Sequence, residues 1–135
     1  MTDKYKKFLE TYFTIFDVET SGLNPEKDDV LEIAALKLKG SDIVDRFEIL
    51  AQPTKSIPPE AERIHGLNEI YLLVNGQSID VVMKKFLNFI GDSIIVGHNI
   101  REFDWLFIIY YCQKMKLAKP EYKIIDTLEL ARKLL

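Results

Sequence analysis

Apolar and polar positions along the chain follow two periods, and each period predicts a kind of element. Residues 11–18, 30–38 and 43–50 are rich in β-branched, aromatic and aliphatic side chains, which is typical of strands. Turn-forming sequences separate them, Ser-Gly-Leu-Asn-Pro at 21–25 and Lys-Gly-Ser-Asp at 39–42. We therefore expect three consecutive antiparallel strands.

The second half of the chain alternates between helical and extended patterns. Residues 53–66 contain two consecutive prolines and predict an irregular segment. A helix is predicted from Ser78, a favourable N-cap, to Gly91, because the apolar residues between them recur at the three-to-four spacing of one helical face. Residues 93–96 form a short apolar run that predicts a strand.

A second helix is predicted over residues 103–115, followed by an edge strand at 123–125. The inward face of that helix is expected to carry Phe103, Leu106, Phe107, Tyr110 and Tyr111. Asp126 then caps a last helix that meets no stop signal before Leu135, so we expect the domain to be truncated at the C-terminus.

Together these elements predict a single domain over residues 1–135. Its class is α/β: a mixed sheet with three antiparallel strands, followed by strands connected through helices. The apolar fraction of 47% is enough to fill one core at this length, and there is no room for a second domain.

Net charge and cysteine content limit the functions and the cellular compartments that we expect for this chain. The net charge of −3 does not favour broad duplex binding, so we expect a nucleic-acid partner to be held locally, through metals. The single cysteine excludes an internal disulfide, and the first residues carry no signal peptide, so the cytoplasm is the expected compartment. The longest apolar runs are too short to cross a bilayer, which argues against a membrane partner.

Asp17 and Glu19 are the sharpest chemical feature. Residues two apart on a strand share a face, so both carboxylates project together from the end of an apolar strand. Paired carboxylates suit Mg²⁺ or Mn²⁺, although the spacing is equally compatible with solvated residues where a strand frays. Thr20, Ser21 and the following glycine make a small, polar turn that leaves space for a ligand.

Asp104 is the second candidate, since it lies near the start of an otherwise apolar helix. Ordinary helix capping is the alternative explanation for this residue, and it also accounts for Asp126. His65 and His98 are candidate general bases, or else hydrogen-bonded structural groups.

Three motifs, in order, carry a family resemblance. They are FDVETSGLN at 16–24, IHGL at 64–67, and VGHN at 96–99 with the Phe-Asp pair at 103–104. Together they resemble the DEDD exonuclease superfamily, in its histidine-type branch, which includes the epsilon proofreading subunit of bacterial DNA polymerase III. The resemblance implies a ribonuclease-H-like fold.

The resemblance also implies residue roles. Asp17, Glu19 and Asp104 match catalytic metal ligands for two Mg²⁺ or Mn²⁺ ions. The positions that match substrate contacts are Thr20, Ser21, Leu23, His65 and Asn99, with Leu23 wedged against the terminal base.

The implied activity is 3′-to-5′ removal of nucleoside 5′-monophosphates from single-stranded DNA ends, in proofreading during replication and with a DNA polymerase subunit as partner. The gap from Asn99 to Asp104 is one residue longer than in the bacterial epsilon pattern, and the third motif, with its histidine and last aspartate, does not occur before Leu135. Two alternatives stay open: an RNA 3′-end exonuclease, for which a contact to the 2′-OH would be decisive, and a non-catalytic remnant that binds nucleic acid or a polymerase.

Overall fold

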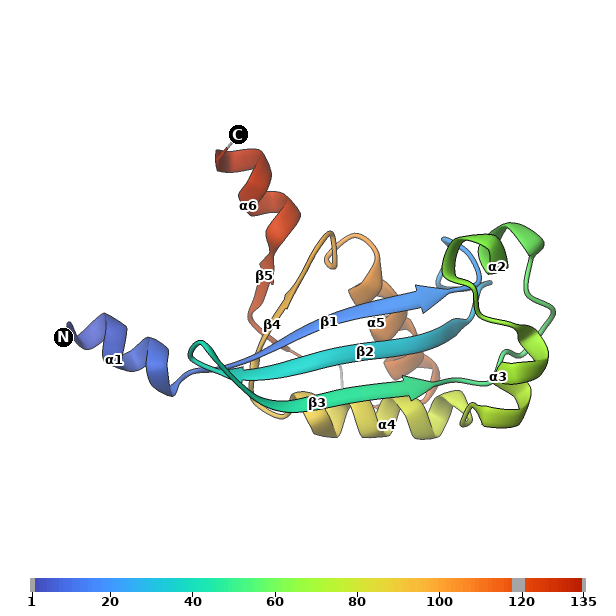
Figure 1. The fold of residues 1–135 in the computed structure, drawn as a ribbon, viewed down its shortest axis with the longest axis horizontal. Coiled ribbons are helices and arrows are strands. Elements are labelled where there is room, and N and C mark those ends of the chain that lie inside the picture. Colours follow the sequence, from blue (N-terminus) through green and yellow to red (C-terminus); the bar gives the residue numbers. More distant parts are fainter. Residues whose placement is uncertain (1, 118–120, 135) are drawn as a thin grey trace.

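The computed structural model describes residues 2–117 and 121–134 of the 135. Its elements, in chain order, are α1 (Asp3–Glu10), β1 (Tyr12–Thr20), β2 (Val30–Lys39), β3 (Asp42–Leu50), α2 (Pro59–His65), α3 (Glu69–Asn75), α4 (Ile79–Ile90), β4 (Ile94–Gly97), α5 (Asp104–Lys114), β5 (Ile124–Asp126) and α6 (Thr127–Leu134). Figure 1 shows them arranged around one sheet.

The sheet has five strands in the order β3-β2-β1-β4-β5. The first three strands are antiparallel neighbours, while β4 runs parallel to β1 and β5 runs parallel to β4. The predicted mixed sheet, with three antiparallel strands followed by helix-connected strands, is therefore confirmed. The hairpin turn between β2 and β3 contains Gly40, whose φ of 58° is the left-handed conformation that glycine adopts without strain.

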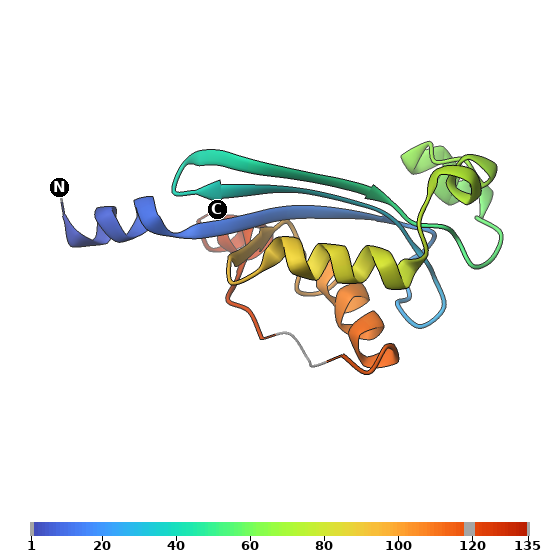
Figure 2. The same cartoon turned by 90° about the horizontal axis from the view of Figure 1, so that it is seen from below.

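One face of the sheet carries the core. Figure 2 shows α4 and α5 side by side beneath it. Phe86 of α4 is fully buried and packs against Phe16 of β1, with ring centroids 5.2 Å apart. Trp105 of α5 meets the same ring edge-on at 6.1 Å. These contacts fix how the first turn of α5 lies relative to β1, and that turn is where Asp104 is found.

The inward face predicted for α5 is correct except at one residue, since Phe107 and Tyr111 are buried and Phe103 and Tyr110 pack against the core. Leu106 was expected to face inward, yet it is 42% exposed, while Trp105 and Ile108 are buried. Both choices keep a three-to-four spacing, and the sequence is apolar nearly all round this helix, so periodicity alone does not select the buried side. The difference matters because the observed register buries Asp104 as well.

The prediction for residues 53–66 was partly wrong, since α2 begins at Pro59 within that segment. Proline fits the first turn of a helix because its missing N–H has no partner there. Two further short helices, α1 and α3, have no counterpart among the predictions. The side chains of Thr2 and Asn68 cap them by accepting hydrogen bonds from the backbone.

Within residues 2–117 and 121–134, no helix combines the length and apolar character needed to cross a bilayer.

Candidate active site

The two carboxylates of β1 lie on the face of the sheet opposite to the core. Along β1, Phe16 and Val18 are buried beneath the sheet, and the residues between them point the other way. Asp17 is paired with Ala34 of β2, whose small side chain leaves open space beside the carboxylate. Glu19 is paired with Glu32, one residue before a register shift at the end of the strand.

Asp104 joins these carboxylates from α5. Its side chain is only 5% exposed, and its Oδ2 accepts a hydrogen bond of 3.0 Å from the backbone N–H of Val18. Because Val18 separates Asp17 from Glu19, this bond brings the third carboxylate to the same end of β1. The structure thus brings together residues that are far apart in the sequence.

Burial and like charge raise the pKa values at this site. Burial, with smaller contributions from the negative charges of Asp17 and Glu19, raises the pKa of Asp104 to about 6 against the lowering effect of the Val18 N–H. Burial, followed by the charge of Asp17, also raises the pKa of Glu19. A cation bound here would favour the ionised forms.

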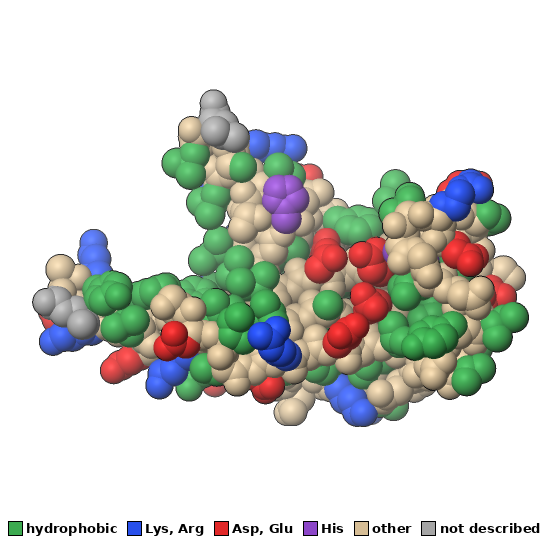
Figure 3. All heavy atoms as spheres, in the orientation of Figure 1, with side chains coloured by type: hydrophobic (Ala, Val, Ile, Leu, Met, Phe, Trp, Pro, Cys, Tyr) green, Lys and Arg blue, Asp and Glu red, His purple; other side chains and the backbone are tan. Residues whose placement is uncertain are grey.

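Two more acids, which the sequence analysis did not single out, belong to this face. Glu32 is the direct cross-strand partner of Glu19, and Glu48 of β3 is paired with Ala34. Burial raises the pKa of Glu32, with smaller contributions from Glu48, Glu19 and Asp17. Figure 3 shows acidic side chains gathered on the open face of the sheet. The signal in the sequence was the lone acid within the apolar run 30–36.

The donor chemistry of this site fits a hard divalent cation. All the converging groups are carboxylates, and their mutual repulsion is relieved by a positive charge. In the described residues, no group of three or more His, Cys, Asp or Glu side chains is arranged so as to hold a metal ion by itself. Mg²⁺ is commonly bound through one or two carboxylates, with waters and substrate phosphates completing the shell.

Three of the predicted substrate residues lie at the end of β1 and in the turn that follows, and they differ in exposure and in hydrogen bonding. Leu23 is 83% exposed, as a residue that contacts a ligand from outside would be. Thr20 donates its hydroxyl to the carbonyl of Gly22, at 2.6 Å. Ser21 is buried, and its Oγ accepts from the N–H of Asp29. The structure therefore gives Ser21 a role in holding the turn, and leaves Leu23 free to contact a substrate.

His65 is the last residue of α2, whereas Asn99 lies in the loop after β4, where its N–H donates to Asp126. The Nδ1 of His65 accepts from the Leu67 N–H at 3.0 Å, so in the neutral ring the proton is on Nε2. This Nε2 is buried and has no hydrogen-bond partner in the described structure. Burial lowers the pKa of His65, although Glu62 and Glu32 oppose the shift. A neutral ring with an unused donor suits a ligand oxygen.

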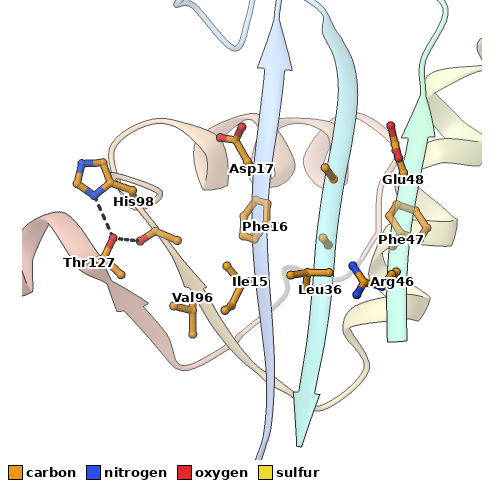
Figure 4. A pocket seen from close by; sticks show the side chains of 13 residues that line it. Ile15, Phe16, Asp17, Leu36, Arg46, Phe47, Glu48, Val96, His98 and Thr127 are labelled. Atoms are coloured by element: carbon orange, nitrogen blue, oxygen red, sulfur yellow. Dashed lines mark hydrogen bonds between the residues drawn. The ribbon is translucent and has the colours of Figure 1, made fainter. Parts of the chain in front are cut away.

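A cavity of about 820 Å³ adjoins the carboxylates on the open face. Its floor includes Ile15, Leu36 and Val96, and Asp17 lies at its rim (Figure 4). On the β4 side, the Nδ1 of His98 is 3.0 Å from the Thr127 hydroxyl, which donates to the carbonyl of Gly97. His98 is thus tied to the start of α6 and not to the acids of β1.

The sheet is mixed, its central strand β1 carries two carboxylates, and α5 supplies a third. This arrangement defines the class of ribonuclease-H-like nucleases. The family model RNase_T, described as exonuclease, matches residues 14–135. The chain belongs to this exonuclease family, and the resemblance to DEDD exonucleases is confirmed.

Similar proteins include very long polymerases. The chain is 39% identical to DNA polymerase III PolC-type of Thermotoga maritima over 128 residues, which are 95% of this chain and 9% of that protein. It is also 39% identical to the PolC-type polymerase of Bacillus cereus over 130 residues, again covering 9% of it. The chain therefore spans about a tenth of the length of these relatives.

Solved structures show the same fold at lower identity. A complex of E. coli exonuclease I with a dT13 oligonucleotide superposes with a TM-score of 0.84 at 17% identity, covering 91% of this chain and 29% of that one. A product-bound exonuclease I gives the same TM-score and identity, covering 91% and 31%. The ribonuclease-H-like fold is therefore confirmed.

Proposed function

We propose that this chain carries a metal-dependent 3′-to-5′ exonuclease site that removes nucleoside 5′-monophosphates from single-stranded DNA ends. The observation that carries the proposal is the bond from the Val18 N–H to Asp104, because it gathers Asp17, Glu19 and Asp104 at one end of β1. The names of the relatives, DNA polymerase III and exonuclease I, support DNA as the substrate.

In this proposal, the acids of the site bind metal ions, and Leu23 and His65 contact the terminal nucleotide. Asp17 and Glu19 would hold Mg²⁺ or Mn²⁺, and Asp104 would help to hold a second ion. Bound divalent cations supply the activation of water and the neutralisation of charge on the phosphodiester. Leu23, exposed beside the acids, packs against the terminal base, and the free Nε2–H of His65 donates to an oxygen of the terminal nucleotide.

The charge of the site makes binding depend on the cation. The substrate phosphates are repelled by the acids of β1 and β2 unless these are neutralised. Chelation of the metal by EDTA should therefore release DNA as well as stop cleavage. A protein that holds DNA through Lys and Arg would keep its DNA under the same treatment.

The proposal extends to proofreading, since the relatives are replicative polymerases that contain a matching segment. A polymerase subunit would deliver the strand, and a mismatched 3′ end would reach the site more readily because it is frayed. Primer–templates with matched and mismatched ends test this point, and we expect faster shortening of the mismatched primer.

The direct experiment incubates the purified chain with 5′-labelled single-stranded DNA, in Mn²⁺ and in Mg²⁺, beside the Asp17→Ala variant. We expect a ladder that shortens from the 3′ end and is lost in the variant. An RNA oligomer of the same sequence is the second substrate, and preferential cleavage of it would replace DNA with RNA in the proposal. A folded protein that shortens neither oligomer would contradict the proposed activity.

A further inference from the structure

Asp126 makes more contacts than a helix cap requires. It is 3% exposed, and its carboxylate accepts hydrogen bonds from the N–H groups of Asn99 at 2.9 Å, Arg101 at 3.2 Å and Leu128 at 3.0 Å. Only the bond from Leu128 belongs to the start of α6. The sequence analysis, which explained this residue by capping alone, missed the other two.

The loop after β4 also bonds back to the β5–α6 junction, through the side chain of Arg101. The Arg101 guanidinium donates to the carbonyl of Ile124 at 2.9 Å, and its Nε lies 3.1 Å from Glu129. The loop after β4 is therefore held to the junction of β5 and α6 from both sides. Burial acts to raise the pKa of Asp126, but the N–H groups of Arg101, Asn99 and Leu128 outweigh it and keep the pKa below its usual value.

The two clamped amides flank Ile100, which is fully buried. The Ile100 side chain occupies the space that a side chain at Gly97 would need. The Ile100 carbonyl accepts from the N–H of Trp105, at 2.8 Å, so the clamped loop leads directly into the first turn of α5. Asn99 has a φ of 58°, an uncommon conformation for a residue other than glycine, and it persists where surrounding contacts enforce it.

We infer that Asp126 is a positioning residue, which fixes the β4–α5 loop so that Asp104 reaches the backbone of β1. The consequence for catalysis rests on the proposed exonuclease function. The mechanical part does not, because it concerns the bond between Asp104 and the Val18 N–H. Asp126 itself contacts neither metal nor DNA in this scheme.

The test compares Asp126→Ala, Asp126→Asn and a matched control in the full chain. Amide hydrogen exchange is read by NMR at Val18, whose N–H bonds to Asp104, and at Trp105, whose N–H bonds to Ile100. Loss of hydrogen bonds to a charged acceptor should accelerate both exchange rates by about tenfold or more in Asp126→Ala. The asparagine variant keeps one carbonyl acceptor, so it should recover part of the protection.

The control is Ser93→Ala, which removes buried hydrogen bonds to Thr14 and Ile90 at the opposite end of β4. It should lower global stability without selectively exposing Val18. Urea denaturation of each variant allows the exchange rates to be compared at equal stability. Arg101→Ala, with a half-exposed side chain, provides a second perturbation in case Asp126→Ala does not fold.

Activity gives a separate readout. If the wild-type chain degrades DNA, Asp126→Ala should lower kcat about tenfold or more with a smaller change in KM, because the substrate contacts of Leu23 and His65 stay in place. If the wild-type chain is inactive, the proposed function fails while the exchange experiment still decides the clamp. Unchanged Val18 exchange in Asp126→Asn and Arg101→Ala, or equal acceleration in Ser93→Ala, would overturn the inference.

Discussion

The side chains of β1 differ between the two faces of the sheet, since those on one face form the core and those on the other face carry the acids. On the covered face, Phe16 and Val18 are 3% and 5% exposed and pack against α4 and α5. On the open face, Ile15 is 39% exposed and Asp17 lies at the rim of a cavity. Adjacent residues of β1 thus belong to the core and to the acidic face in turn.

This comparison shows how a short domain separates stability from chemistry. Burial of apolar area favours folding on one face, whereas the carboxylates on the other face repel one another and oppose it. The expectation is that changes on the covered face alter stability most. Changes on the acidic face should leave stability equal or higher while reducing the proposed activity.

The largest effect is expected for Phe86→Ala. This side chain is fully buried and touches both Phe16 and Phe47, so its removal leaves a cavity between α4 and the sheet. We expect the free energy of unfolding to fall by about 3–5 kcal/mol. Urea denaturation followed by circular dichroism measures it, and a loss below about 1 kcal/mol would mean that the covered face is not the main source of stability.

The second-largest effect is expected for Asp104→Asn, which should raise the free energy of unfolding instead of lowering it. The folded-state pKa of about 6 lies above the ordinary 3.8, so ionised Asp104 destabilises the fold above about pH 6 and the penalty vanishes below about pH 4. The amide still accepts the Val18 N–H. In EDTA at pH 7 we expect the variant to be about 1–2 kcal/mol more stable, after allowance for solvent screening.

Denaturation of Asp104→Asn and wild type at both pH values checks the sign. The gain at pH 7 should disappear at pH 4, and DNA cleavage should be lost at pH 7 despite the higher stability. An equal difference at both pH values would show that ionisation of Asp104 is not its cause.

A smaller gain is expected for Glu32→Gln. Glu32 faces Glu19 directly across the β1–β2 pair, and like charges in that arrangement are unfavourable. Removing one charge should raise the free energy of unfolding by about 0.5 kcal/mol in low salt, with less gain in 1 M NaCl. Glu26→Gln, in the loop between β1 and β2, is the control that changes the same net charge. An equal gain in both variants would point to overall charge as the cause.

The smallest effect on stability is expected for Leu23→Ala. Because this side chain is 83% exposed, its loss should change the free energy of unfolding by less than about 0.5 kcal/mol. The proposed contact with the terminal base predicts a several-fold higher KM for single-stranded DNA all the same. Fluorescence anisotropy in the cleavage-deficient Asp104→Asn background, which keeps the proposed cation ligands Asp17 and Glu19, measures the binding part. An unchanged affinity would remove Leu23 from the substrate site.

The local sequence pattern was sufficient to predict the strands and to show that the two acids of β1 share a face. The apolar and β-branched runs 11–18 and 30–38 predict strands, and the strand period of two predicts that Asp17 and Glu19 share a face. The local pattern does not predict that Asp104 meets Val18, since that contact depends on the crossing of α5 beneath the sheet. The same reason hid the clamp at Asp126, which joins segments about 25 residues apart.

The errors also have physical causes. The helix α2 was taken as irregular because paired prolines suggest a turn, although proline is compatible with a helix start. Leu106 was wrongly assigned to the inward face of α5 because apolar residues surround most of the helix and tertiary packing selects among them. The substrate roles of Ser21 and its neighbours remain predictions from family resemblance, and the bond from the Asp29 N–H to Ser21 adds a part in holding the turn.

The strict alternation along β1 also limits how its gene can change. Deletion of the Asp17 codon would turn the remaining residues of the strand to the other face, placing Glu19 in the core and Val18 in the solvent. Removal of two codons would keep the alternation and shorten the strand. Length changes of this strand in a library of variants should therefore survive in even steps, a constraint that substitutions at the same positions do not share.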